Sequence, residues 1–486
     1  MSKVEADKFY PFDINHPPRG WIVSYIKDVA EEIRPGFASG KHNSIGHGIP
    51  HIRPMNIDRQ GRLNLSEVKS VSGDNSLRLR RGDVLFNNTN SPALIGKTTA
   101  ILRDDELAFS NHMTRLQLRN GHDPRFIAHQ LHYLWSRGYF RHRCVNHVNQ
   151  ASISKTALDN TVPLLLAPQD QQQRIVAKIE ELFSDLDAGV AALERVQANL
   201  QRYRASVLKA AVEGRLTQQW RAEHPDVEPA DQLLQRILHE RREKWEQDQL
   251  AKYEAKGKKP PKNWKDKYKE PAAPDTTNLP ELPKGWCWAT AQQLTAPLKP
   301  IIYGILKPGP HTPDGVPYVR VMEMKTGTIN VRSLKRCNKE RAEKFKRATL
   351  SEGDILVSKD GTIGKVAIVP PELEGGNITQ HVLRFSASPH VLNCYIARAI
   401  EAPFCQAWMK GETKGVALQG VNVEDFRRMP IPLPPAAEQA VIADEITSGQ
   451  VDLTRLEKTI TQDIQRSGRL RQAILKRAFE GSLTTN

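Results

Sequence analysis

"IPHIRPMNI" runs from Ile49 to Ile57, and "VPYVRVMEM" runs from Val316 to Met324. Pro, Arg and Met hold the same places in both stretches, and most other positions exchange one residue for a similar one. Further pairs follow in the same order, at offsets between 265 and 271 residues. These pairs are Pro18–Trp21 with Pro283–Trp286, Arg81–Leu85 with Glu352–Leu356, Ile95–Lys97 with Ile363–Lys365, Asn111–His112 with Gln380–His381, Pro163–Pro168 with Pro430–Pro435, and Val207–Thr217 with Ile474–Thr484. The chain is therefore a tandem duplication, and because the repeat far exceeds solenoid periods of about 20–50 residues, each copy should contain a folded unit.

Length and composition indicate a globular protein with more than one domain. A chain of 486 residues exceeds what one hydrophobic core usually holds, and an apolar fraction of 39% is sufficient for folding. The first residues, "MSKVEADKFYPFD", lack an apolar signal core, and no apolar run reaches membrane-spanning length. The five cysteines form no CxxC pair. We therefore expect a soluble cytoplasmic protein with reduced thiols.

The formal net charge of +15 is concentrated in two places. Residues 1–160 carry 22 Lys/Arg against 15 Asp/Glu, and residues 280–430 carry 21 against 14, so each stretch has a net charge of +7. Residues 163–217 and 431–486 are neutral. Two equal basic modules favour a polyanion held at two places, such as nucleic acid, over a merely basic soluble surface.

The neutral segments show the periodicity of long helices. From Gln171, apolar residues recur on two heptad positions over about six heptads, which predicts a coiled-coil helix roughly 60 Å long. The second copy keeps this register but is interrupted at Gly449, Asp463 and Ser467. We expect the two helices to pack antiparallel within the chain as a rod with a module at each end, and a plain dimerisation coiled coil is the alternative. The first seam comprises Ile175, Leu182, Val196 and Tyr203 on one position, and Ile179, Leu186, Leu193, Leu200 and Val207 on the other; the second comprises Ile442, Ile446, Leu453, Leu456, Ile460, Leu470 and Ile474.

These patterns divide the chain into five segments. Residues 1–162 and 280–429 are the basic modules, and residues 163–217 and 430–486 are the long helices. Residues 218–279 begin as a charged helix and continue as a Lys/Pro-rich linker. A solvated spacer is the expected role of this segment, with contact to phosphates or a partner protein as the alternative.

Inside each module the pattern is one of short strands and loops. "GDVLF" at 82–86 and "GDILV" at 353–357 predict a turn followed by a strand, and "KTTAIL" and "KVAIV" predict strands after a Gly-Lys turn. Between them lie two polar loops, residues 87–97 and 358–365. Their amide, hydroxyl and cationic groups are those needed to read base edges and hold phosphates, although an ordinary surface loop is the alternative.

Three patterns that suggest catalysis are each incomplete. "SPALIGKT" has Ser91 where a phosphate-binding loop has its first glycine, and a strand-like "TAIL" follows. Asp314, Glu323 and Lys325 have the spacing of a metal-dependent nuclease, but the first copy lacks it. His142-x-Cys144-x-x-His147 lacks an evident fourth metal ligand. The chain also contains no adenine-methyltransferase motif and no glycine-rich cofactor loop, so we expect it to bind DNA without catalysis, cofactor or metal.

The repeated motifs resemble those of the specificity subunits of type I restriction–modification enzymes. The resemblance covers essentially the whole chain and rests most specifically on "PLPPAAEQ" at 432–439 and on the "LKAAVEGRLT" and "LKRAFEGSLT" endings. Ala167 and Gln171 depart from it in the first copy. It implies a mixed α/β fold, in which two target recognition domains with small twisted sheets are separated by two antiparallel coiled-coil helices with pseudo-twofold symmetry.

The resemblance also implies function and partners. Each module would read half of a split DNA site, and the helices would set the gap and dock two methyltransferase subunits, completed by two restriction subunits. S-adenosylmethionine, ATP and Mg²⁺ would bind to those partners, where adenines are flipped out of the duplex. A duplicated DNA-binding regulator or scaffold without a methyltransferase partner is the competing class, and a nuclease built on Asp314, Glu323 and Lys325 is a third.

The expected DNA contacts come from matched places in the two copies. Arg53 and Arg320 are also candidates for a structural role in holding a turn. The full set is Arg53, Asn56, Asn87, Asn88, Thr89, Asn90, Lys97, Asn111 and His112 in the first module, and Arg320, Glu323, Lys359, Thr362, Lys365, Gln380 and His381 in the second.

Overall fold

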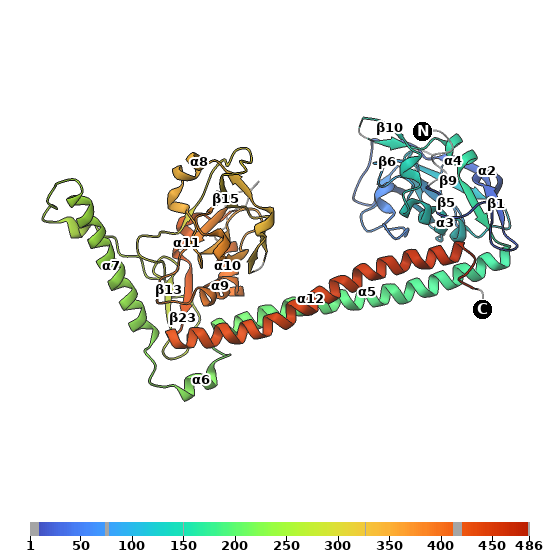
Figure 1. The fold of residues 1–486 in the computed structure, drawn as a ribbon. Coiled ribbons are helices and arrows are strands. Elements are labelled where there is room, and N and C mark those ends of the chain that lie inside the picture. The colour runs from blue at the N-terminus through green and yellow to red at the C-terminus, as the bar shows by residue number, and fades with distance from the viewer. Residues whose placement is uncertain (1–8, 73–76, 149, 326, 412–419, 485–486) are drawn as a thin grey trace. The chain divides into compact units, whose positions relative to one another are not determined.

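The computed structural model describes residues 9–72, 77–148, 150–325, 327–411 and 420–484 (Figure 1). The chain divides into two compact units. Unit 1 comprises Met1–Arg195 with Thr459–Asn486, and unit 2 comprises Val196–Lys458. The division cuts through both long helices, so each unit contains one basic module together with helical segments from both copies of the repeat.

Unit 1 contains a four-stranded antiparallel sheet beside a three-stranded sheet. The first has the order β2 (Ala30–Pro35), β9 (Met113–Leu118), β5 (Val84–Asn87) and β7 (Thr98–Ala100). The second has the order β4 (Lys69–Val71), β3 (Ile49–Ile52) and β8 (Ala108–Phe109), with β3 and β8 parallel. Smaller elements complete the unit: β1 (Ile22–Tyr25) pairs with β12 (Pro163–Leu166), β11 (Ala151–Ser152) lies between β10 (Val145–Asn146) and β6 (Thr89–Asn90), and the helices are α2 (Ile26–Val29), α3 (Pro124–Ser136) and α4 (Lys155–Thr161).

The two main sheets of unit 2 repeat the strand orders of unit 1. Its four-stranded sheet has the order β14 (Ile302–Tyr303), β22 (Val382–Phe385), β19 (Ile355–Ser358) and β20 (Val366–Ile368). Its three-stranded sheet has the order β18 (Lys335–Cys337), β15 (Val316–Val319) and β21 (Asn377–Ile378), again with one parallel pair. The remaining elements are β13 (Cys287–Thr290) paired with β23 (Pro430–Leu433), β16 (Met324–Lys325) paired with β17 (Thr328–Ile329), and helices α8 (Lys339–Lys344), α9 (Asn393–Glu401), α10 (Pro403–Gly411) and α11 (Val423–Arg428). The predicted duplication and the predicted strands after "GD" and "GK" are confirmed.

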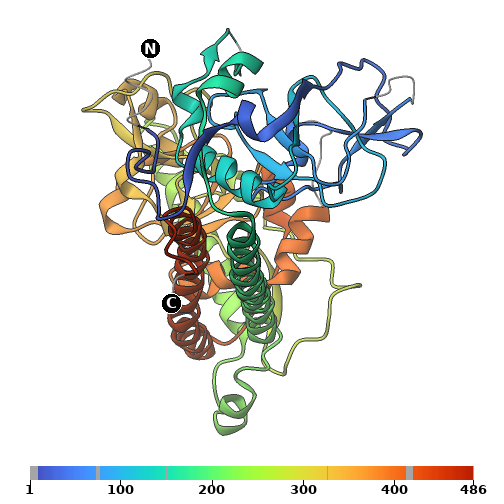
Figure 2. The same cartoon turned by 90° about the vertical axis from the view of Figure 1, so that its right-hand side faces the viewer.

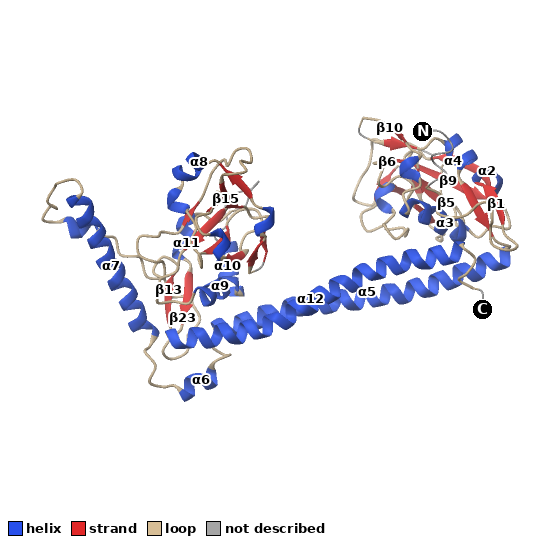
Figure 3. Ribbon diagram, in the orientation of Figure 1, coloured by secondary structure: helices blue, strands red, loops and turns tan. Residues whose placement is uncertain are grey.

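An inner strand of each four-stranded sheet, β5 in unit 1 and β19 in unit 2, is buried along its whole length (strands are red in Figure 3). Val84 and Phe86 belong to the core that contains α3, whereas Leu85 belongs to the core shared with β3 and β8. In unit 2, Leu356 likewise faces a different core from its two neighbours. Because successive strand side chains point to opposite faces, one short apolar run serves two cores.

The two long helices, α5 (Gln169–Val212) and α12 (Ala436–Phe479), each have 44 residues. In unit 1 the first half of α5 lies antiparallel to the last part of α12 (Figures 1 and 2). Phe479 enters the core of the module, where its ring centroid lies 5.9 Å from that of Phe12 and 5.3 Å from that of Phe126. Helical residues therefore complete the core of the module.

One of the two predicted heptad positions in α5 is wrong in the second half of the helix. Val196 is 42% exposed and Tyr203 is 58% exposed, so neither lies in a buried seam. In unit 2, Tyr203 instead lines a groove with Gly449 and Leu453. Because Gly449 has no side chain to fill the space between the helices, no knobs-into-holes contact forms there.

Residues 218–279 contain the predicted charged helix, α7 (Ala230–Glu254), between α6 (Gln218–Glu223) and a short turn at Trp264–Lys267. Leu233 and Ile237 of α7 are buried in the core of unit 2. The chain after α7 packs back on this helix, with the ring of Trp264 6.0 Å from that of Trp245. The first half of α7 is therefore packed on unit 2, whereas most side chains of residues 255–279 are exposed. Within the described ranges, no helix is long and apolar enough to cross a membrane.

Candidate nucleic-acid interface

The repeated motifs converge on a joint that attaches each module to the helices. In unit 2, the carboxylate of Glu438 is fully buried and accepts hydrogen bonds from Trp286 Nε1 (2.8 Å) and Thr217 Oγ1 (2.5 Å). Arg221 pairs with the same carboxylate. A Cβ atom on Gly214 would lie 2.6 Å from Pro283 Cγ, so only glycine fits at the end of α5.

Unit 1 contains the corresponding joint, in which the neutral Gln171 takes the place of Glu438. Trp21 Nε1 donates to Gln171 Oε1 at 3.2 Å, and a Cβ atom on Gly481 would lie 2.7 Å from Pro18 Cβ. The motifs "PxGW", "EQ" and "GxLT" thus have a structural role. They fix the module on the helices and leave the far ends of the strands free for binding.

In unit 2, four loops meet around a cavity of about 550 Å³. They follow β14, β15, β19 and β21 at the same end of the two sheets. Four of the expected DNA contacts line this cavity: Arg320, Thr362, Gln380 and His381. The structure therefore brings together residues that are up to about sixty positions apart in the sequence and that we selected from three separate loops.

A buried carboxylate holds the turn after β15. Glu323 is 2% exposed, and it accepts hydrogen bonds from the backbone N–H of Arg320 at 2.9 Å and from its Nε at 3.0 Å. These hydrogen bonds raise the pKa of the Arg320 guanidinium. Glu323 therefore supports the turn, and Arg320 both pairs with Glu323 and lines the cavity.

Asp360 connects the other two loops of this cavity. Lys359 Nζ lies 2.7 Å from Asp360 Oδ2, and His381 Nδ1 lies 2.9 Å from the same oxygen. Gln380 Nε2 is 3.1 Å from His381 Nε2. Asp360, which we did not select from the sequence, thus compensates the charge of Lys359 and orients His381, which in turn contacts Gln380.

The turn after β3 in unit 1 has the same construction with a neutral residue. Asn56 is 2% exposed, accepts a hydrogen bond from the backbone N–H of Arg53 at 3.0 Å, and donates to the Asn64 carbonyl at 3.1 Å. In the described part of the chain no carboxylate pairs with Arg53. The guanidinium of Arg53 is therefore more available to a phosphate than that of Arg320.

Buried polar residues support this turn from below. Lys97 is 6% exposed, and its Nζ donates to the carbonyls of Pro54 (2.9 Å) and Ile57. Burial lowers the pKa of Lys97. Lys365 makes the equivalent but longer contact, with Nζ 3.4 Å from the Val321 carbonyl. Both lysines, selected as phosphate contacts, are directed into the protein.

The remaining candidates in unit 1 fall into two groups. Asn87 and Asn88 are buried, and Asn88 Nδ2 donates to Thr114 Oγ1 at 2.7 Å, so they shape the loop. A second group is at least partly exposed at the ends of the strands: Arg53, Thr89, Asn90, Asn111 and His112. Sequence reasoning overlooked two exposed residues in these turns, Met55 and Met322, although the repeated Met was visible in the opening stretches.

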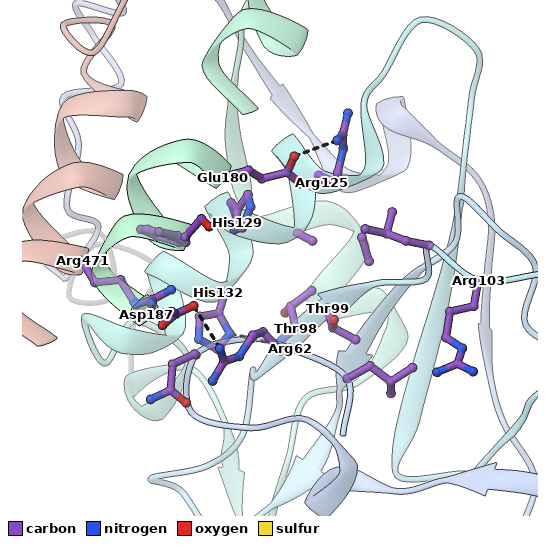
Figure 4. A pocket seen from close by; sticks show the side chains of 18 residues that line it. Arg62, Thr98, Thr99, Arg103, Arg125, His129, His132, Glu180, Asp187 and Arg471 are labelled. Carbon is purple, nitrogen blue, oxygen red and sulfur yellow. Dashed lines mark hydrogen bonds and ion pairs between the residues drawn. The ribbon is translucent and has the colours of Figure 1, made fainter. Parts of the chain in front are cut away.

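Unit 1 also contains a second cavity, of about 480 Å³, between the module and the helices (Figure 4). Asp187 of α5 joins Arg62 at 3.0 Å and Arg471 at 2.5 Å. His132 in its wall is 5% exposed, and burial lowers its pKa to about 4. None of the expected DNA contacts lines this cavity, and its ion pairs fasten the module to the helices.

The patterns that suggested catalysis have other roles in the structure. Lys97 of the loop resembling a phosphate-binding loop is buried, and a strand follows it, as predicted. Glu323 of the nuclease-like set is bound to Arg320. Among the residues that the structure describes, no group of three His, Cys, Asp or Glu side chains is arranged to hold a metal ion.

Comparisons with known proteins show which proteins this chain resembles. Residues 310–466 match the family model described as the type I restriction modification DNA specificity domain. The chain is 27% identical over 475 residues to the EcoBI type I specificity subunit of Escherichia coli, covering 96% of this chain and 86% of that one. It is 22% identical to the EcoKI specificity subunit of Escherichia coli strain K12, covering 96% and 90%.

A solved structure shows the same fold. One chain of a structure titled for complex assembly and conformational transition of the type I R-M system aligns with a TM-score of 0.65 and 16% identity, covering 96% of this chain and all of that one. The fold class expected from the sequence is confirmed.

The chain thus resembles type I DNA specificity subunits along almost its whole length, and the fold that it shares with the solved structure agrees with that resemblance. The family match at residues 310–466 and the curated relatives confirm the resemblance drawn from the repeated motifs.

Proposed function

We propose that this chain reads a two-part DNA target with one module per half-site and positions partner subunits that modify or cut the DNA. The observation that carries the proposal is the matched pair of loop faces. Both modules present loops from the same ends of the same strands, and the loops differ in their exposed side chains. One framework with two sets of side chains is what reading two different half-sites requires.

The residues divide into supporting and contacting groups under this proposal. The contacts proposed are the partly exposed residues of each face, such as Arg53, Asn90 and Asn111 in unit 1 and Thr362 and Gln380 in unit 2. These loops would be held in place by the buried Asn56, Asn87, Asn88, Lys97 and Glu323, together with the partly buried Lys365.

Partner subunits supply the chemistry in this proposal. Two adenine-N6 methyltransferase subunits would dock on the helices and bind S-adenosylmethionine, and two restriction subunits would use ATP and Mg²⁺. The exposed Tyr203 beside the groove at Gly449 supports docking there, because a large aromatic side chain at a partly filled helix pair is a suitable anchor for a protein partner.

The test is modified-base sequencing of DNA from cells with and without the gene. We expect N6-methyladenine in both halves of a bipartite motif, lost on deletion, and complementation with Gln380→Ala should relax one half only. A gene-dependent motif read as a single block would contradict the two-module proposal. Absence of gene-dependent methylation, together with no captured methyltransferase, would favour the regulator or scaffold.

A Tyr203→Lys variant separates the two parts of the proposal. A charged side chain in the groove should abolish co-purification with the methyltransferase while leaving binding of the isolated chain to the duplex unchanged. A control variant, Arg202→Ala on the exposed side of the same helix, should retain both.

A further inference from the structure

Two methionines of this chain are exposed, and they occupy the same position of the two modules. Met55 is 56% exposed and Met322 is 72% exposed. The other methionines that the structure describes are each at most 1% exposed: Met113, Met324, Met409 and Met429. Exposure of an apolar thioether at one duplicated position, in a chain that otherwise buries this residue, indicates a role that both modules share.

The turns that carry these methionines are held by several hydrogen bonds. In each turn the backbone N–H of the preceding arginine donates a hydrogen bond to a side-chain oxygen, that of Asn56 at 3.0 Å or that of Glu323 at 2.9 Å. The carbonyl just before each methionine accepts a hydrogen bond from the buried Lys97 or from Lys365. A turn fixed in this way presents its outermost side chain at a defined place, so little conformational entropy of the backbone is lost on binding.

The surroundings of the methionines indicate the ligand. Met322 lines the same cavity as Arg320, Thr362 and His381. Met55 lies two positions after Arg53 on the equivalent turn. A thioether neither donates a strong hydrogen bond nor carries charge, so it adds nothing to a phosphate contact. It suits the apolar parts of bases, namely the thymine methyl group and the faces exposed when a base step opens.

We propose that Met55 and Met322 are matched base-contacting residues, one for each half-site, that press an apolar side chain against the base pairs between the polar contacts of each face. This inference rests on the proposed function and adds to it a residue pair that determines affinity for the bases. The partner is duplex DNA at the centre of each half-site.

The test uses the full chain and duplexes that carry the motif found by modified-base sequencing. Met55→Ala and Met322→Ala should each weaken binding about tenfold, whereas Met→Leu at either place should bind within twofold, because leucine keeps the apolar volume. On a duplex with one half-site scrambled, only one of the two alanine variants should still lose affinity. Thermal melts that match the wild type would confirm that the exposed positions are not needed for folding.

Two modified duplexes distinguish the apolar targets. Replacing thymine by uracil should remove the effect of one methionine if it contacts a methyl group, and 2-aminopurine fluorescence should rise on binding if it opens a base step. Alanine variants that bind within twofold of the wild type, while Gln380→Ala loses affinity, would overturn this inference and leave the proposed function intact. Loss of methyltransferase capture without any change in DNA binding would also overturn it, since the methionines would then belong to a protein interface.

Discussion

The buried carboxylate of Glu438 gives the most direct test of how the modules are attached. Glu438→Gln keeps the shape and the acceptor for Trp286 but removes the charge opposite Arg221, which is only 18% exposed. A hydrogen bond to a charged group is worth about 1.5–3 kcal/mol, and an uncompensated buried charge costs more. We expect the free energy of unfolding of unit 2 to fall by about 2–3 kcal/mol.

The matched control lies at the same position of the other repeat. Gln171 is neutral and half-buried, and its contact with Trp21 is longer, at 3.2 Å, so Gln171→Ala should cost about 1 kcal/mol or less. Urea unfolding followed by circular dichroism gives the size of both effects. Because the two units can open separately, hydrogen exchange of peptides 214–221 and 283–290 assigns the loss to unit 2.

Glu438→Gln with a free energy of unfolding within 0.5 kcal/mol of the wild type would refute this reasoning, because the ion pair would then contribute no more than an exposed one. Equal loss of protection in both units would refute it as well, since the joint would not be local.

Three further predictions concern single positions. Burial lowers the pKa of His132 to about 4, below the value of about 6.5 in an unfolded chain. Between these two pH values the unfolded chain binds more protons than the folded chain, so the melting temperature of the wild type should fall as pH drops from 6.5 to 4. The variant His132→Gln should show a smaller fall over the same pH range. Gly304→Ala should cost about 2–3 kcal/mol by urea unfolding and weaken DNA binding, because its Cβ atom would lie 2.0 Å from the Ile378 carbonyl oxygen. Gly189→Ala should raise stability by about 1 kcal/mol in the same assay, because it is a helix-interior glycine with no atom within 4 Å of the new Cβ; destabilisation would show that the helix surface is constrained there.

The architecture could be predicted from the sequence because the duplication repeats the pattern of each strand, so each prediction could be checked against the other copy. The turns at "GD" and the strands after "GK" recur in both copies, and they occur in both units with identical sheet orders. The buried positions of α5 were harder to predict, because a heptad pattern does not show which residues of the partner helix lie opposite it. A groove lies beside Gly449, which interrupts the second heptad register, and Tyr203 on its edge is 58% exposed.

The candidate site could be located but not resolved from the sequence. A polar residue in a loop has two partners available, solvent and the backbone of the protein, and only the position of distant carbonyls decides between them. Lys97 turns inward because the carbonyls of Pro54 and Ile57 lie beneath it. Asn56 turns inward because its side-chain oxygen accepts a hydrogen bond from the backbone N–H of Arg53. Met55 was passed over because apolar residues in a strand-like stretch are usually buried.

The packing of Phe479 against Phe12 and Phe126 has a consequence for synthesis on the ribosome. The ribosome completes the strands and helices of the first module long before the segment that fills its core. The delay from the end of β12 to Phe479 corresponds to roughly 310 residues, or about 15–60 s at 5–20 residues per second. During that interval aromatic side chains such as Phe12 and Phe126 lack their final neighbour, and unit 1 has a high contact order despite its short strands. The nascent first module is therefore the stage at which this protein is most exposed to chaperones and to aggregation.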